Sequence, residues 1–195
     1  MTENKNVKLS VLNLVPKFQN DTDIDAINRA TELIKIVEKL GYHRYWVAEH
    51  HNFRGVLSSA TALIIQHLLA NSEKIRVGAG GVMLPNHTSL QVAETYGTLE
   101  TLYPGRVDLG IGRAPGTDSD TAALIYRTQY VRTSKFVEAI KDIQRFMGSE
   151  EEQGIVSAYP GINTNVPIFM LGSSIHSASV SGELGLPYSF AGHFS

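Results

Sequence analysis

The sequence contains no cysteine, so neither a disulfide nor a thiolate metal site can form within it. It also has no uninterrupted apolar run long enough to cross a bilayer. The polar N-terminal stretch MTENKNVKLS lacks the apolar segment of a secretory signal. These absences predict a cytoplasmic protein that makes no contact with a membrane.

Positive and negative charges are nearly balanced. The chain has 17 Lys and Arg against 19 Asp and Glu, for a net charge of −2. Because no basic cluster stands out, we expect no nucleic-acid interface. The 195 residues are 43% apolar, which is enough for a substantial core. We therefore expect residues 1–195 to form a single domain.

Short apolar runs alternate with longer segments of helical periodicity. Strands are predicted at residues 7–15, 43–50, 74–84, 106–112, 166–172 and 186–192. Helices are predicted at residues 23–40, 58–70, 89–102, 130–147 and 174–184. Thr22 is suited to cap the start of the first helix, and Gly41 its end.

This alternation predicts parallel strands joined by right-handed crossovers, either as an open doubly wound sheet or as a (β/α)8 barrel. The sequence NLVPKFQND follows the first strand, so the glycine-rich turn of a dinucleotide-binding sheet is missing. Polar candidates follow strands two to five, which is typical of the C-terminal rim of a barrel. These observations favour an α/β fold of the (β/α)8 TIM-barrel type.

The predicted barrel is incomplete, with about six βα units present, whereas a full barrel takes about 250 residues. Its first and last strands would leave exposed edges, which proteins normally avoid. We expect the chain either to lack the C-terminal part of a barrel or to complete its sheet with a partner.

Four motifs in this order make the sequence similar to a known family: RYWVAEHHN, VGAGGVMLPNH, LETLYPGRVDLGIGRAPGTD and VPIFMLGSS. Together they resemble the bacterial luciferase-like flavin-dependent monooxygenases, from Leu9 to Phe194. Members of that family continue well beyond the last residue of this chain.

The resemblance implies a TIM barrel that takes FMN as reduced flavin, often from a separate flavin reductase. With O2 it would oxygenate a small organic substrate such as an aldehyde, an alkane or a small organic acid. The deazaflavin F420 is the less favoured cofactor. A homodimer formed through the helices at residues 58–70 and 89–102 is also implied. The alternative is a non-catalytic flavin-binding or structural fragment that dimerises.

The EHH sequence at residues 49–51 could bind metal, transfer protons or hold the end of a strand. Consecutive strand residues point to opposite faces, so His50 and His51 are not expected to share an ion. We predict no metal site. We expect Glu49 and His51 to be partners that hold the strand end. By the resemblance, His50 matches a histidine near the flavin that assists proton transfer, which an imidazole can do near neutral pH.

Glycines occupy the third and fourth predicted strands, where they weaken pairing unless something must approach the backbone closely. By the resemblance, Gly80 and Gly81 carry a non-proline cis peptide under the flavin ring; the alternative is small residues in a crowded barrel. Arg113 would contact the flavin phosphate or ribityl chain, with an ion pair to Asp118 or Asp120 as the alternative.

Serines follow the fifth strand in the sequence LGSSIHSAS. Ser173, Ser174 and Ser177 open a helix whose free N–H groups suit a phosphate, and the resemblance assigns them to the flavin phosphate. True luciferases carry glutamate at the position of Ser173, so the contacts can differ. The alternative is an N-cap without a ligand.

Overall fold

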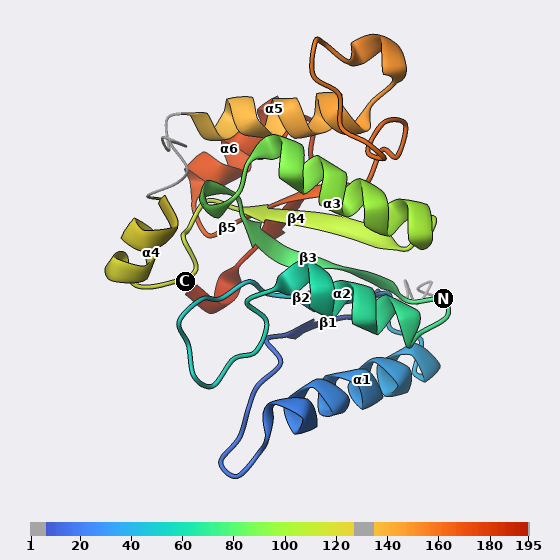
Figure 1. Ribbon diagram of the computed structural model, residues 1–195, viewed down its shortest axis with the longest axis vertical. Coiled ribbons are helices and arrows are strands. Elements are labelled where there is room, and N and C mark those ends of the chain that lie inside the picture. The colour runs from blue at the N-terminus through green and yellow to red at the C-terminus, as the bar shows by residue number, and fades with distance from the viewer. Residues whose placement is uncertain (1–6, 127–134, 195) are drawn as a thin grey trace, which may run out of the picture.

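The computed structural model describes residues 7–126 and 135–194. Its core is a six-stranded parallel sheet in which each strand pairs with the next along the chain (Figure 1). The strands are β1 (Ser10–Asn13), β2 (Arg44–Val47), β3 (Arg76–Met83), β4 (Val107–Gly112), β5 (Ile168–Gly172) and β6 (Tyr188–Phe190).

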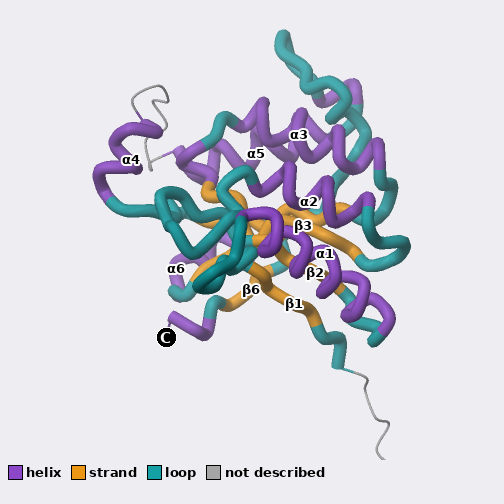
Figure 2. Tube along the Cα trace, turned by 60° about the horizontal axis from the view of Figure 1, so that its bottom comes forward, coloured by secondary structure: helices purple, strands orange, loops and turns teal. Residues whose placement is uncertain are grey.

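Helices connect the strands and cover one side of the sheet, where α1, α2, α3 and α5 follow one another in chain order (Figure 1). Figure 2 shows them in an arc around the strands. The α-helices are α1 (Asp23–Lys39), α2 (Thr61–Ala70), α3 (Ser89–Leu102), α4 (Ser119–Tyr126), α5 (Phe136–Met147) and α6 (Ile175–Glu183). Short 3₁₀ turns lie at η1 (Leu84–Asn86), η3 (Glu150–Glu152) and η4 (Gly192–Phe194).

The sheet curls into a half-barrel, which confirms the predicted incomplete TIM-barrel fold. Alternate strand residues are fully buried on one face, including Val47, Val77 and Leu109. On the other face the rings of Trp46 and Phe169 meet edge to face, 5.3 Å apart. Among residues 7–126 and 135–194, none of the helices combines the length and the apolar character that a transmembrane span requires.

Local sequence explains several element boundaries. Thr22 caps α1 in a reciprocal capping box, and Gly41 adopts a φ of +77° after its last turn, as predicted. The first strand is shorter than predicted because the Asn13 side chain accepts a hydrogen bond from the Val15 N–H and Val15 has a φ of +52°. Pairing therefore stops at Asn13.

The fourth crossover departs most from the prediction. The helix predicted at residues 130–147 begins at Phe136, and residues 130–134 of that prediction lie outside the described residues. A separate helix, α4, was not predicted. Its signal is Asp118, whose Oδ1 accepts hydrogen bonds from the N–H groups of Asp120 and Thr121, as an N-cap does.

Candidate functional site

The candidate residues follow the carboxyl ends of parallel strands. Glu49 and His50 come after β2, Arg113 directly follows β4, and Ser173 directly follows β5. Because the strands are parallel and paired in order, these ends lie at one edge of the sheet.

A buried carboxylate organises this edge. Glu49 is 2% exposed, and its Oε1 accepts hydrogen bonds from His51 Nε2 at 2.8 Å and Asn86 Nδ2 at 3.0 Å. Its Oε2 accepts from the Met83 N–H at 3.0 Å and from His87 Nε2 at 2.9 Å. Burial alone would raise the pKa of Glu49, but hydrogen bonds from the two imidazoles and from Met83 lower it to about 2. The expected pairing of Glu49 with His51 is confirmed.

His50 differs from its neighbours because it does not join this network. Its Nδ1 is buried and has no hydrogen-bond partner within the described residues. Burial lowers its pKa, the Glu49 charge acts to raise it, and His51 acts to lower it further. A neutral imidazole with an unsatisfied nitrogen can accept or donate a proton toward a bound molecule. Its catalytic role stays a prediction.

A cavity of about 200 Å³ lies between the end of β4 and the start of α6. It brings Arg113 together with Ser177, two of the predicted cofactor residues, and adds His176, which the sequence reasoning did not single out. The signal for His176 is its position in the first turn of α6, after the N-cap Ser174. Its walls are Arg113, Phe136, Val137, Met170, Leu171, His176, Ser177 and Val180.

The serine hydroxyls at this helix start are engaged within the protein. Ser174 caps α6, and its Oγ accepts a hydrogen bond from the Ser177 N–H at 3.2 Å. Ser177 Oγ donates to the Ser174 carbonyl at 2.7 Å and lies 2.9 Å from the Tyr188 hydroxyl. Ser174 therefore has the N-cap role expected as the alternative, Ser177 completes its capping box as the N3 residue, and Ser173 is exposed beside them.

The peptide bond between Gly80 and Gly81 is cis, as the resemblance implied. Close packing accounts for the absence of side chains at both positions. A Cβ on Gly80 would lie 2.8 Å from Trp46 Cβ, and one on Gly81 would lie 2.8 Å from the Gly110 carbonyl oxygen. Neither glycine lines the cavity beside Arg113.

Arg113 does not pair with either acid proposed as its alternative partner. Asp118 instead accepts hydrogen bonds from Asn52 and Thr121, which hold its pKa well below its usual range. Arg113 is exposed at the end of β4, and no ion pair within residues 7–126 and 135–194 includes it. No group of three or more His, Asp or Glu among the described residues could hold a metal ion.

Comparison with known proteins places this geometry in context. A family model described as luciferase-like monooxygenase matches residues 9–195. The chain is 52% identical over 191 residues to an uncharacterised protein, YddN, of Bacillus subtilis, covering 98% of this chain and 56% of that one. It is 41% identical to a luciferase-like monooxygenase of Escherichia coli, covering 98% of this chain and 57% of that one. The chain thus spans little more than half the length of these relatives.

Solved structures share the fold. The crystal structure of apo-MsnO8 is 32% identical, with a TM-score of 0.87 over 94% of this chain and 55% of that one. The oxygenating constituent of 3,6-diketocamphane monooxygenase, solved with FMN, has a TM-score of 0.71 at 13% identity over 93% of this chain and 56% of that one. An F420-dependent secondary alcohol dehydrogenase has a TM-score of 0.62 at 18% identity over 90% and 55%. The last two likenesses concern the fold alone.

Proposed function

The chain belongs to the luciferase-like monooxygenase family, and on that premise we propose that it forms the FMN-binding part of a monooxygenase. The protein would use reduced FMN and O2 to oxygenate a small organic substrate. A separate flavin reductase would supply the reduced flavin. FMN is preferred to F420 because the resemblance implies it.

The observation that carries this proposal is the convergence of Arg113 and the start of α6 on one cavity. A guanidinium presents donors in a fork that fits phosphate oxygens, and the first N–H groups of a helix attract anions. The hydroxyls of Ser174 and Ser177 and the Ser177 N–H are engaged within the protein, which leaves the N–H groups of Ile175 and His176 and the His176 imidazole as donors. The residues present therefore fit the phosphate end of FMN.

His50 is the candidate acid–base residue. The unsatisfied Nδ1 and the lowered pKa support a neutral imidazole that exchanges a proton with a bound group. Bound FMN would supply the redox chemistry that activates O2. The protein would place His50 beside the reacting centre, with Gly80 and Gly81 as part of the wall.

A titration with FMN and riboflavin tests the phosphate site, because riboflavin lacks the phosphate. Arg113→Ala should weaken FMN binding by about tenfold or more, since hydrogen bonds to charged groups contribute about 1.5–3 kcal/mol. Riboflavin binding should stay unchanged. Lys39→Ala is the matched control, because Lys39 is an exposed cation at the end of α1.

Equal loss of FMN and riboflavin affinity in Arg113→Ala would contradict the phosphate assignment. If the folded chain binds neither flavin, the alternative of a structural fragment replaces the proposal. If it binds flavin but oxygenates no aldehyde, alkane or small organic acid of a test panel when supplied with reduced FMN and O2, the non-catalytic alternative holds.

We further propose that the protein is a homodimer that packs through α2 and α3. Large apolar side chains on both helices support this, since Leu63 is 71% exposed and Leu102 is 57% exposed. Leu63→Glu should shift the elution of the protein in gel filtration from dimer to monomer. A wild-type protein that is monomeric at micromolar concentration would overturn this proposal.

A further inference from the structure

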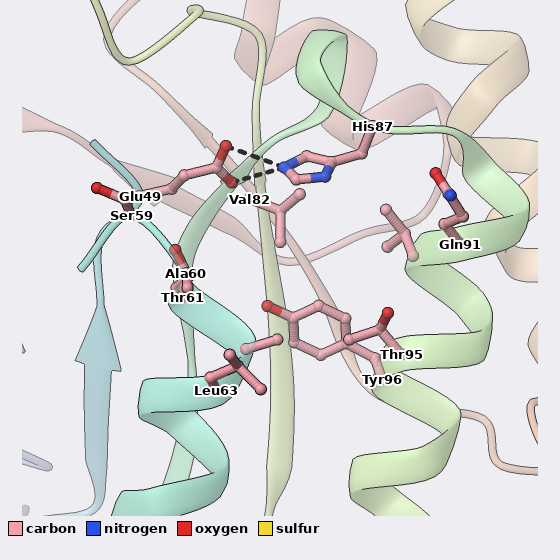
Figure 3. A pocket seen from close by; sticks show the side chains of 12 residues that line it. Glu49, Ser59, Ala60, Thr61, Leu63, Val82, His87, Gln91, Thr95 and Tyr96 are labelled. Atoms are coloured by element: carbon pink, nitrogen blue, oxygen red, sulfur yellow. Dashed lines mark hydrogen bonds and ion pairs between the residues drawn. The ribbon is translucent and has the colours of Figure 1, made fainter. Parts of the chain in front are cut away.

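Glu49 holds together several loops at the carboxyl ends of the strands, not only its own loop with His51. It lies in the loop after β2, yet it binds the Met83 N–H at the end of β3 and the side chains of Asn86 and His87 beyond it. Figure 3 shows the Glu49 carboxylate facing the His87 ring across the end of β3, with both contacts drawn as dashed lines. Two loops are therefore held on one buried charge.

The loop after β4 joins the same network. Asn86 Nδ2 also donates to the Pro115 carbonyl at 2.9 Å. The His51 N–H donates to the Gly116 carbonyl at 3.1 Å, and Thr117 Oγ1 donates to the His51 carbonyl at 2.9 Å. The loop that carries Arg113 is thus fixed to His51 and Asn86, which both donate hydrogen bonds to Glu49 Oε1.

His50 stands between two residues that this network immobilises. The Glu49 N–H points to the Gly81 carbonyl at 3.4 Å, and both the side chain and the backbone of His51 are bonded. We propose that Glu49 is a positioning residue that fixes the loops after β2, β3 and β4 and thereby orients His50 and Arg113 toward the flavin. This inference rests on the proposed function for the flavin itself.

The charge of Glu49 acts on the pKa of His50, which a residue that contributed only packing would leave unchanged. The titratable groups that face Glu49 are His50, His51, His87 and the buried Tyr96 hydroxyl of α3. Burial lowers the pKa of His50, and the Glu49 charge opposes this more strongly than His51 adds to it. Removing the Glu49 charge should therefore lower the pKa of His50 further.

The experiment compares Glu49→Gln with Glu38→Gln. Glu38 is a matched control because its carboxylate also ties two elements together by accepting backbone N–H groups, here those of Glu73, Lys74 and Ile75 at 2.6–3.2 Å. These residues precede β3, so the control lies at the opposite edge of the sheet. His87→Gln is a second variant that keeps Glu49 and removes one of its partners.

Two quantities are measured for each folded variant: the NMR titration of His50 in the flavin-free protein and the FMN dissociation constant. We expect Glu49→Gln to lower the His50 pKa and to weaken FMN binding by about tenfold, with a smaller weakening of FMN binding in His87→Gln. Glu38→Gln should leave both quantities at wild-type values even though it lowers the melting temperature.

The inference is overturned if Glu49→Gln and Glu38→Gln both lose stability while the His50 titration and FMN affinity stay at wild-type values. If Glu49→Gln does not fold, a wild-type FMN affinity in His87→Gln decides against it. If the wild-type protein binds no FMN, the proposed function fails, but the His50 titration still decides whether Glu49 sets the state of that imidazole.

Discussion

Arg44 reaches past the intervening strand β3 to bind Asp108, with 2.9 Å between Arg44 Nε and Asp108 Oδ2. Arg76 binds the same carboxylate through Nε and Nη2 at 2.9 Å and 2.6 Å. Gly78 leaves the space for this contact, because its Cβ would lie 2.8 Å from Asp108 Cβ. A fully buried carboxylate and two partly buried guanidinium groups thus join three strands inside the half-barrel.

Asp108→Asn should lower the free energy of unfolding by about 3 kcal/mol, because it leaves two partly buried cations without a counter-charge. Urea denaturation measures the change. Asp120→Asn, at an exposed position, should stay within about 0.5 kcal/mol of wild type. Equal stability of the two variants would show that Asp108 contributes only packing.

The stability of the protein should fall in acid through Glu49. Its pKa is lowered from 4.5 to about 2 in the folded state, so its stabilising contribution is fully present above pH 4.5 and is lost as the pH falls toward 2. This shift corresponds to about 3 kcal/mol. Denaturation at pH 6 and pH 3 should show a smaller acid loss for Glu49→Gln than for wild type; equal losses would contradict the assignment.

Two buried tyrosines should respond oppositely to loss of the hydroxyl. The Tyr45 hydroxyl accepts from Asn13 Nδ2, whereas the Tyr96 hydroxyl has no partner within the described residues. Tyr45→Phe should cost about 1–3 kcal/mol because it leaves the Asn13 amide unpaired, and Tyr96→Phe should leave stability unchanged or slightly raised. Calorimetry of both variants checks this, and a large loss in Tyr96→Phe would reveal a missing partner of that hydroxyl.

Substitution by alanine distinguishes glycines that are tightly packed from glycines that have open space around them. Gly81→Ala would place a Cβ 2.8 Å from the Gly110 carbonyl oxygen and against the Leu171 side chain, and should destabilise the protein by about 1–3 kcal/mol. Gly182→Ala, in α6 with nothing within 4 Å of the new Cβ, should stabilise it by up to about 1 kcal/mol. Thermal unfolding measures both, and a neutral Gly81→Ala would argue against a packing role.

The sequence predicted the fold well because its signals are local. Strand and helix periods alternate, and Thr22 and Gly41 bound the first helix as expected. Helix α4 was missed because its eight residues are too short for a clear period, although Asp118 provided the cap. Spacing alone could not identify Arg44 on β2 and Arg76 on β3 as the partners of the Asp108 carboxylate on β4.

The site was less accessible to sequence reasoning. Pairing of Glu49 with His51 was expected from their place at the end of a strand, yet the bonds to Met83 and His87 depend on how β2 and β3 lie together. A serine after a strand suits both a phosphate and a helix cap, and only coordinates reveal that Ser177 is engaged with Tyr188. Contacts between residues far apart in the sequence thus decide which of two possible roles a residue has.

The strand order β1 to β6 repeats the order of synthesis. Each strand emerging from the ribosome finds its neighbour already made, so this half-barrel can grow by adding one βα unit at a time to a preceding template. Ribosome-bound chains should accordingly acquire protease resistance in successive steps from the N-terminal end.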